Sequence, residues 1–416
     1  MPAAGENLRI NSERLWDSLM EMAKIGPGVA GGNNRQTLTD ADSEGRHLFK
    51  AWCDAAGMTM AVDAMGNMFA TRAGEDPDAL PVYMGSHLDT QPTGGKYDGV
   101  LGVLGALETV RTMNDLGIRT RRPIVVTNWT NEEGTRFAPA MLASGVFAGV
   151  HDQDFAYARQ DADGKRFGDE LNRIGWVGEE TVGGRKMHAM LELHIEQGPI
   201  LEAEGKDIGV VTHGQGLWWL QVTLTGKDAH TGSTPMAMRV NAGLGMARIT
   251  ERVHQIAMSH QPDAVGAIGH ANVYPNSRNV IPGKAVFTVD LRSPDQDKLD
   301  AMRAELERAA HAVAAELGLG CEIEVAGHFD PVTFDPDLVK IVRQSAEKLG
   351  HSHRDIVSGA GHDACWINRV APTVMVMCPC VDGLSHNEAE DISPQWAAAG
   401  TDVLLHSALE LAEVVG

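Results

Sequence analysis

The feature that most constrains the fold is an apolar segment that ends in polar residues, followed by a helical pattern and a second such segment. LPVYMGSHLD (residues 80–89) predicts a buried strand, GVLGVLGALETVRTMNDLG (99–117) a helix, and RPIVVTNWTNEEG (122–134) another strand. A strand, helix, strand unit predicts an α/β fold whose ligands gather beyond the carboxyl ends of its strands. The polar residues that close these strands are therefore the first candidates for a functional site.

The chain also changes its pattern along its length. Its 416 residues exceed what one ordinary hydrophobic core holds, which predicts more than one domain. Residues 212–328 carry a strand and helix series of their own, including LWWLQVTLTG and KAVFTVDLRSP, and residues 329–416 return to the earlier alternation. We therefore expect residues 1–211 and 329–416 to form one larger domain, with residues 212–328 inserted into it.

The composition excludes several classes of partner. The formal net charge of -21, without a cluster of Lys and Arg, argues against a nucleic-acid partner because such binding depends on neutralising phosphates. Five cysteines are an odd and sparse set, unlike the disulfide framework of a secreted domain, and they favour the reducing cytosol. The N-terminal segment shows neither a targeting signal nor an apolar run of about 20 residues. We expect a cytoplasmic protein with no membrane partner.

The first strand end carries a histidine and two aspartates among glycines. His87 and Asp89 stand two residues apart, so in a strand they share a face, as a metal-binding imidazole and an orienting carboxylate would. An ordinary surface hydrogen bond is the alternative interpretation of that pair. The glycines that follow permit backbone conformations that turn the carboxylate of Asp98 inward. The loop therefore indicates a binding site more strongly than the pair does.

The other strand ends add further ligands of the same kind. Glu132 and Glu133 are adjacent acids, which repel unless a cation or a proton separates their roles, so one can bind metal while the other handles a proton. His194 closes the predicted strand AMLELHIEQG, and His386 follows the apolar segment TVMVMC. The combined set is His87, Asp98, Glu133, His194 and His386. Five such ligands exceed one tetrahedral zinc site and suit two ions that share a carboxylate.

Motifs along nearly the whole chain carry a family resemblance. They are GSHLDTQPTGGKYDGVLG, TNEEGTRF, LELHIEQGPILE, GKDAHTGSTPM, NVIPG with VDLR, and SGAGHDA. In this order they resemble the dinuclear metal amidohydrolases that cleave N-carbamoyl amino acids and related ureido compounds, a branch of the aminoacylase and carboxypeptidase superfamily. That branch includes N-carbamoyl-L-amino acid amidohydrolase, β-ureidopropionase and allantoate amidohydrolase.

The resemblance implies a fold and a ligand set. The fold would be α/β, with a mixed-sheet catalytic domain (1–211 and 329–416) and a smaller inserted α+β domain (212–328) that serves as lid and dimer contact. His87, Asp98 and His194 would hold one divalent ion, and Asp98, Glu133 and His386 the other, with Asp98 as the bridge. Zn²⁺ is the expected ion, and Mn²⁺, Co²⁺ or Ni²⁺ are alternatives because such ligands accept several metals.

The resemblance also implies roles at the reacting centre. Glu132 would be the general base, His230 would assist at the oxyanion site, and Arg292 suits a substrate carboxylate because its planar fork binds one bidentately. A surface ion pair is the alternative for Arg292, and a turn-capping histidine is the alternative for His230. The expected substrate-binding set is Gln197, His230, Asn279, Arg292, Gly361 and His362.

The expected reaction is hydrolysis of a ureido bond to give an amino acid, ammonia and carbon dioxide. We expect N-carbamoyl-β-alanine as the substrate, on the likeness of QPTGGKYDG to β-ureidopropionases, whereas GLWW resembles the carbamoyl-L-amino acid enzymes. N-Carbamoyl-L-α-amino acids, allantoate or another carboxylate-bearing amide are alternatives, and the family's tendency predicts a homodimer. A metal-binding scaffold with a dead site is the hypothesis from another class, and it has no use for a free Glu132.

Overall fold

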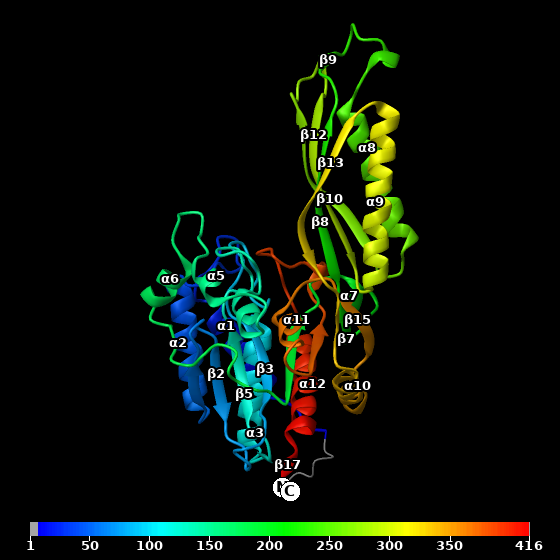
Figure 1. The fold of residues 1–416 in the computed structure, drawn as a ribbon. Helices are drawn as coiled ribbons and strands as arrows, with labels where there is room; N and C mark the ends of the chain where they lie inside the picture. The colour runs from blue at the N-terminus through cyan, green and yellow to red at the C-terminus, as the bar shows by residue number, and fades with distance from the viewer. Residues whose placement is uncertain (1–6, 416) are drawn as a thin grey trace. The chain divides into compact units, whose positions relative to one another are not determined.

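A computed structural model of the chain describes residues 7–415 and divides it into two compact units (Figure 1). Unit 1 consists of Met1–Thr212 and Phe334–Gly416, and unit 2 of His213–Thr333, beside the insertion expected at 212–328. The first six residues, part of the segment searched for a targeting signal, lie outside the described residues. Among the residues described, no helix combines the length and apolar character that a membrane crossing requires.

Unit 1 is built around a mixed sheet of nine strands within the described residues, of which the end strand, residues 332–333, and its pairing partners 213–214 fall in unit 2. The strands are β1 (Thr59–Val62), β2 (Met68–Arg72), β3 (Val82–His87), β5 (Ile124–Trp129), β6 (Ala189–Ile195), β7 (Ile208–Gly214), β14 (Val332–Thr333), β15 (His353–Ser358) and β16 (Thr373–Cys378). Their order is β1-β2-β5-β3-β6-β16-β7-β14, with β15 paired to β7. The mixed α/β class predicted from the sequence is confirmed.

The central strands of this sheet run parallel, which decides where the polar strand ends meet. β3 pairs in parallel with β5 and β6, and β6 pairs in parallel with β16. β2, β1 and β7 join antiparallel at the two sides. The carboxyl ends of β3, β5, β6 and β16 therefore lie at one edge of the sheet.

Helices cover both faces of the sheet, so its central strands are buried and rich in apolar residues. α3, α12, α1 and α10 pack together over one face, while α4 and α11 pack on the other around Phe69, Tyr83, Trp129 and Phe147. The helices of unit 1 are α1 (Ser12–Met22), α2 (Asp40–Ala55), α3 (Val100–Asp115), α4 (Leu142–Phe147), α5 (Gln153–Tyr157), α6 (Phe167–Arg173), α7 (Ile200–Ala203), α10 (Pro336–Leu349), α11 (Asp363–Ile367), η2 (Val381–Gly383) and α12 (Pro394–Ala412). β4 (Arg119–Thr120) and β17 (Val414–Val415) pair separately.

Glycines let α3 approach the sheet closely. A Cβ at Gly102 would lie 2.3 Å from the carbonyl oxygen of Leu193, and one at Gly105 would lie 3.0 Å from Oγ1 of Thr401. Close packing of the helix therefore explains the glycines at these two positions. Gly99 differs, because it precedes the helix with φ +67 and a Cβ there would meet the ring of His87 at 2.3 Å.

Unit 2 is a layer of helices on a sheet. In the described chain its main sheet has the order β10-β12-β8-β13, all antiparallel, and α8 and α9 cover one face. The alternation of buried and half-exposed residues along β12 is that of a strand with one face in a core. The elements are β8 (Gly216–Thr225), β9 (Ala229–His230), η1 (Met236–Met238), α8 (Ala242–Ser259), β10 (Val265–Tyr274), β11 (Val280–Ile281), β12 (Lys284–Ser293), α9 (Gln296–Leu317) and β13 (Gly320–Phe329).

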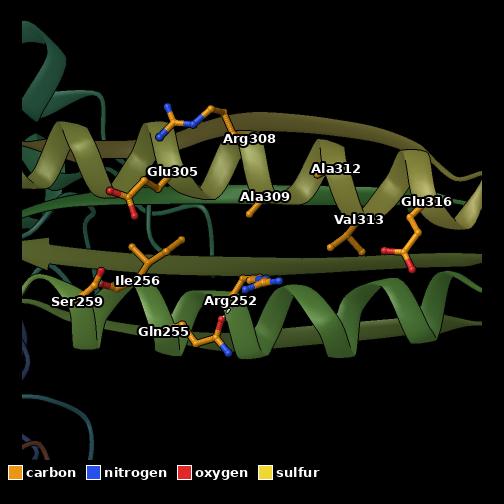
Figure 2. A pocket seen from close by; sticks show the side chains of 10 residues that line it. All are labelled: Arg252, Gln255, Ile256, Ser259, Glu305, Arg308, Ala309, Ala312, Val313 and Glu316. Carbon is orange, nitrogen blue, oxygen red and sulfur yellow. Dashed lines mark hydrogen bonds between the residues drawn. The ribbon is translucent and has the colours of Figure 1, made fainter.

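A groove of about 590 Å³ runs between α8 and α9 (Figure 2). Its floor holds Ile256 and Val313, and its rim holds charged side chains such as Arg252, Glu305 and Arg308. The residues described along it include none of the predicted site residues. The groove is therefore a feature of helix packing and gives no support to a reaction there.

Candidate functional site

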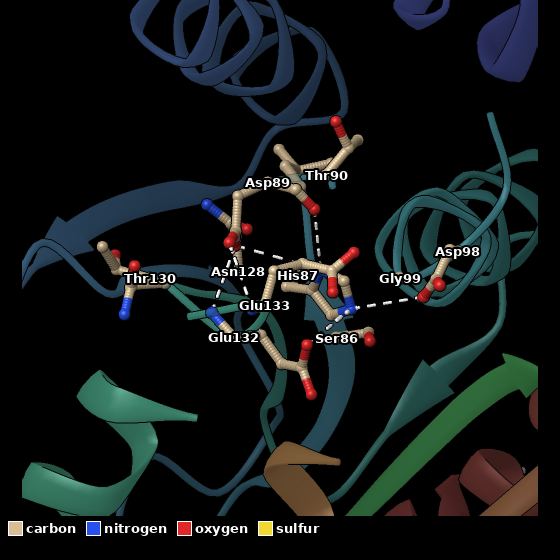
Figure 3. Close-up of polar contacts among 12 residues, drawn as sticks. Ser86, His87, Asp89, Thr90, Asp98, Gly99, Asn128, Thr130, Glu132 and Glu133 are labelled. Carbon is tan, nitrogen blue, oxygen red and sulfur yellow. Dashed lines mark hydrogen bonds and ion pairs between the residues drawn. The ribbon is translucent and has the colours of Figure 1, made fainter. Parts of the chain in front are cut away.

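The predicted metal ligands meet at the carboxyl edge of the sheet in unit 1. His87 ends β3, His194 is the penultimate residue of β6, and Glu132 and Glu133 follow β5 (Figure 3). Asp98 comes from the glycine-rich loop that leads into α3. Four segments that are separate in the sequence thus contribute to one cluster, because parallel strands deliver their ends to the same place.

Asp98 is the centre of this cluster. Its Oδ1 lies 3.1 Å from Nε2 of His194 and 3.6 Å from Nε2 of His87. Its Oδ2 lies 3.5 Å from Nε2 of His386, which is in turn 3.4 Å from Oε2 of Glu133. Each oxygen of one carboxylate therefore faces a different set of partners.

Two groups of possible metal ligands result, and they share Asp98. In each group the ligand atoms lie within 4.8 Å of one another. The groups are His87, Asp98 and His194, and Asp98, Glu133 and His386, and we call these five residues the metal cluster.

A third group of possible ligands among the described residues has its carboxylate already occupied. Glu192, His194 and His362 also bring their ligand atoms within 4.8 Å of one another. However, the hydroxyl of Ser86 donates to Oε1 of Glu192 at 2.6 Å, and the main-chain N–H of Ala364 donates to Oε2 at 2.8 Å. Glu192 is thus satisfied by protein donors and needs no ion.

The state of the histidines fits a cation within the metal cluster. Nδ1 of His87 lies 2.9 Å from the carbonyl oxygen of Asp89, and Nδ1 of His194 lies 2.9 Å from that of Ile195. A carbonyl only accepts, so Nδ1 carries the hydrogen in each neutral ring and Nε2 presents a lone pair toward Asp98. Nε2 of His87 is buried and has no hydrogen-bond partner among the described residues. The main-chain N–H of Gly99 donates to Nε2 of His194 at 3.2 Å, so the lone pair on Nε2 of His87 is the one left for a cation.

Electrostatics indicate the same need for positive charge. Burial lowers the pKa of His194, but the hydrogen bond and charge of Asp98 outweigh burial and raise that pKa to about 9. Burial lowers the pKa of His87 to about 4. Burial raises the pKa of Asp98, but the hydrogen bond and charge of His194 hold it well below its usual range. A buried carboxylate with imidazoles beside it is therefore a set of groups that attracts positive charge.

Asp89 supports the site differently from what the sequence suggests. Its carboxylate is 3.9 Å from Nδ1 of His87, too far for the expected orienting hydrogen bond, and its main-chain carbonyl makes that contact instead. The carboxylate accepts the main-chain N–H groups of Glu132 and Glu133, both at 3.3 Å. The strand ends at His87, so Asp89 lies beyond it and the face shared by strand residues two apart does not extend to its side chain.

The adjacent glutamates point to different partners. Glu133 receives a hydrogen bond from Nε2 of Gln91 at 2.5 Å and faces His386. Glu132 is buried, with Oε2 3.4 Å from Nε2 of His87. Burial, with the negative charges of Asp363 and Glu133, raises the pKa of Glu132 well above its usual value. A carboxylate in that state accepts a proton more readily than an exposed glutamate does.

The predicted substrate residues of unit 1 border the metal cluster. Nε2 of Gln197 donates to Oδ2 of Asp98 at 2.8 Å. The buried ring of His362 lies 4.3 Å from that of His194, between centroids, and its Nε2 is 3.0 Å from Oγ of Ser358. Gly361 is exposed, and a Cβ there would meet Cε of Met141 at 2.8 Å. These three residues therefore lie beside groups that the metal cluster uses.

The remaining predicted residues belong to unit 2. β9 and β11 pair His230 with Val280, and the main-chain N–H of Thr231 donates to the carbonyl of Asn279 at 2.9 Å. Nδ1 of His230 accepts the N–H groups of Gly232 and Ser233 at 3.0 and 3.2 Å. In the neutral ring Nε2 therefore carries the hydrogen, as the expected donor role requires.

Arg292 is engaged within its own strand. Its Nη2 donates to Oδ2 of Asp290 at 2.8 Å, and its Nε lies 3.1 Å from Oδ1 of the same carboxylate. Residues two apart on a strand share a face, which explains the pairing. The ion pair weighed as an alternative from sequence is thus present, and a ligand carboxylate must compete with Asp290.

Several supporting residues escaped the sequence analysis. Gln91, Ser385 and Glu390 contact the metal cluster or its loops, and Glu192 supports α11 beneath it. Glu192 alone had a readable signal, because it stands two residues before His194 on the same face of β6. The others act from loops, where sequence spacing carries no geometric information.

Comparison with known proteins places these observations in a family. The model of peptidase family M20/M25/M40 matches residues 83–410. The N-carbamoyl-L-amino-acid amidohydrolase of Rhizobium meliloti is 73% identical over 415 residues, covering 100% of both chains, and that of Geobacillus stearothermophilus is 33% identical, covering 97% of this chain and 99% of its own. A crystal structure of an amidase of the hydantoinase/carbamoylase family from Burkholderia multivorans has a TM-score of 0.97 and 54% identity, covering 98% of this chain and 99% of its own.

Proposed function

The chain belongs to peptidase family M20/M25/M40 and is a hydrolase, and we propose that it cleaves the carbamoyl C–N bond of N-carbamoyl-L-α-amino acids. The products are the free amino acid, ammonia and carbon dioxide, for one water consumed. The observation that carries the proposal is a carboxylate, Asp98, set between two groups of metal ligands with the buried Glu132 beside them. This is the arrangement that two-metal hydrolysis requires.

The metal cluster would hold two divalent ions. His87, Asp98 and His194 would bind one, and Asp98, Glu133 and His386 the other. When bound, such ions lower the pKa of a water and polarise a carbonyl, which a weakly electrophilic ureido carbon needs. The donor set of imidazoles and carboxylates suits Zn²⁺, and it accepts Mn²⁺, Co²⁺ or Ni²⁺ as well.

Glu132 moves the proton in this proposal. Its raised pKa suits a group that takes a proton from the attacking water and returns it to the leaving nitrogen. Glu133 is committed to Gln91 and His386, so only one of the adjacent acids is available for that task. The main-chain hydrogen bonds to Asp89 fix the direction in which each glutamate leaves the backbone.

Residues of unit 2 would bind the rest of the substrate. Arg292 would bind the α-carboxylate in place of Asp290, since a planar fork holds either carboxylate bidentately. His230, with Nε2–H as donor, and Asn279 would bind the carbamoyl oxygen. Gln197, Gly361 and His362 would line the unit 1 side of the substrate.

The proposed substrates are N-carbamoyl-L-α-amino acids, one of the alternatives, rather than N-carbamoyl-β-alanine. Relatives that match the full chain, one of them at 73% identity, carry the name of N-carbamoyl-L-amino-acid amidohydrolases. These relatives do not show β-ureidopropionase activity, which rested on the likeness of one loop. The α-amino acid substrate is therefore the proposal, and the β-alanine derivative becomes a comparison substrate in its test.

The test is ammonia release from a substrate panel by the metal-reconstituted enzyme. N-carbamoyl-L-α-amino acids, their D-enantiomers, N-carbamoyl-β-alanine and allantoate are compared by kcat/KM. Preferred turnover of the L-α compounds supports the proposal, and preferred turnover of either other ureido compound contradicts it. The absence of turnover with Zn²⁺, Mn²⁺, Co²⁺ and Ni²⁺ would favour a scaffold with a dead site.

We further propose a cytoplasmic homodimer that associates through unit 2. The five cysteines all lie among the described residues and are free thiols, as in a reducing compartment. Sedimentation of the purified chain measures the association state. A monomer at micromolar concentration would contradict the dimer.

A further inference from the structure

His386 is the least enclosed member of the metal cluster. Its side chain is 52% exposed, whereas those of His87 and His194 are 1% exposed. Its backbone has φ +53, in the left-handed region, and it lies in the loop between η2 and α12 rather than on a strand. No strand holds this imidazole, so its position depends on the loop and on its contacts with Gln197, Asp98 and Glu133.

Glu390, four residues farther along, ties this loop to the loop of Asp98. Its Oε1 accepts the main-chain N–H groups of Tyr97 and Asp98 at 3.0 and 3.1 Å. Its Oε2 accepts from the hydroxyl of Ser385 at 3.0 Å, and Oγ of Ser385 also lies 2.9 Å from Oδ2 of Asp98. The buried carboxylate of Glu390 thus binds both the backbone at Asp98 and the side chain of Ser385, the residue before His386.

The Asp98 loop is shaped to receive this carboxylate. A Cβ at Gly95 would lie 2.0 Å from Cδ of Glu390, and the nearest atoms around it all belong to that side chain. Gly94 exchanges main-chain hydrogen bonds with Asn33 at 2.9 and 3.0 Å, which anchors the loop from the other side. The glycines after His87 therefore serve two purposes, to turn Asp98 inward and to admit Glu390.

We propose that Glu390 is a positioning residue that sets the spacing between Asp98 and His386, and so controls binding of the second ion. The inference rests on the proposed two-ion centre and adds a residue outside the ligand set. Glu390 touches neither substrate nor ion in this account. It acts through the backbone of Asp98 and through Ser385.

The experiment is titration of the metal-free full-length chain with ZnCl₂ by calorimetry, with bound zinc counted by elemental analysis. Glu390→Ala should leave the first ion in place and weaken the second about 10- to 100-fold, the usual cost of losing a group that supports a ligand. Glu390→Gln keeps an acceptor for both N–H groups and should bind both ions within a few-fold of wild type. Unchanged affinity for the second ion in Glu390→Ala overturns the inference.

Gly95→Ala tests the same contact without removing it. The added methyl displaces the carboxylate of Glu390, so this variant should also weaken the second ion. In the Glu390→Ala background the methyl has room, so the double variant should match Glu390→Ala alone. Additive losses would overturn the inference, and this arm remains informative if one of the single variants folds poorly.

Asp402→Ala is the matched control. Asp402 is as buried as Glu390 and also accepts a main-chain N–H, that of Ile10 at 2.8 Å, but it lies on α12 and contacts Arg9. Its loss should lower the melting temperature and leave both ions bound, and equal loss of the second ion would overturn the specific role of Glu390. A wild-type chain that binds fewer than two ions contradicts the proposed metal centre instead. The zinc count of the wild-type chain alone gives that result, without any variant.

Discussion

The two units hold their polar residues in opposite ways. In unit 1, Glu132 is 7% exposed and His87 1% exposed, and both sit where strands of a doubly covered sheet end. In unit 2, His230 is exposed on the two-stranded sheet β11-β9, and Arg292 is half-buried on the main sheet, which has one face in a core. The difference agrees with the proposed roles, because reacting groups need fixed geometry and a dry setting, whereas groups that collect a substrate must remain accessible.

Glu132→Gln should have the largest effect, because it removes the proposed proton acceptor, which is a buried side chain of unit 1. We expect kcat to fall by about 10²- to 10⁴-fold, the usual worth of general acid–base catalysis. Zinc content should stay at the wild-type value, because Glu132 is not among the proposed ligands. Calorimetric titration with zinc and ammonia release measure the two quantities, and substantial activity in the variant would assign the proton transfer to another group.

Metal removal should affect hydrogen exchange differently in the two units. At a free ion concentration of 100 times Kd, binding stabilises the folded state by about 2.7 kcal/mol, and that stabilisation is lost on chelation. Hydrogen exchange of the full-length chain should then rise in the loops that carry Asp98 and His386. Exchange in β8 and β12 should not change, and a uniform rise over both units would show that the units do not respond separately.

Arg292→Ala should act on binding rather than chemistry. Loss of a charged hydrogen-bonding partner costs about 1.5 to 3 kcal/mol, so KM should rise about 10- to 100-fold with a smaller change in kcat. Arg292→Lys should not restore KM, because an ammonium lacks the planar fork. Steady-state kinetics decide, and an unchanged KM would mean that the substrate carboxylate binds elsewhere.

Asp290→Asn should give the smallest effect and in the opposite direction. Asp290 competes for the fork of Arg292, and a partly exposed ion pair is worth about 0.2 to 1 kcal/mol. Removing its charge should lower KM by about two- to fivefold at low ionic strength, and added salt should reduce the difference. A raised KM would show that Asp290 helps to orient Arg292 for the substrate.

Much of the fold was predictable because it is written in local patterns. The strand, helix, strand unit and the change of pattern in the inserted region gave the mixed α/β class, and the polar strand ends of β3, β5 and β6 indicated where functional groups would gather. Parallel pairing then brings those ends together with no further information from sequence. Residues on strands could therefore be placed by their spacing.

Residues on loops could not be placed in this way. The contact of His87 with the carbonyl of Asp89 depends on where a strand stops, and the hydrogen bond from Gln197 to Asp98 depends on a left-handed backbone at Gln197. Glu390 lies far from Asp98 in the sequence and accepts its main-chain N–H only in the folded chain. Such contacts follow from tertiary structure, and one sequence read alone does not encode them as a pattern.

The position of β16 in the sheet means that the strands on both sides of it are synthesised before it. β16 lies between β6 and β7 in the sheet, although both are translated more than 150 residues earlier. Until β16 leaves the ribosome, the nascent chain has a gap in the middle of its sheet. The open edges of β6 and β7 can then pair with a wrong strand.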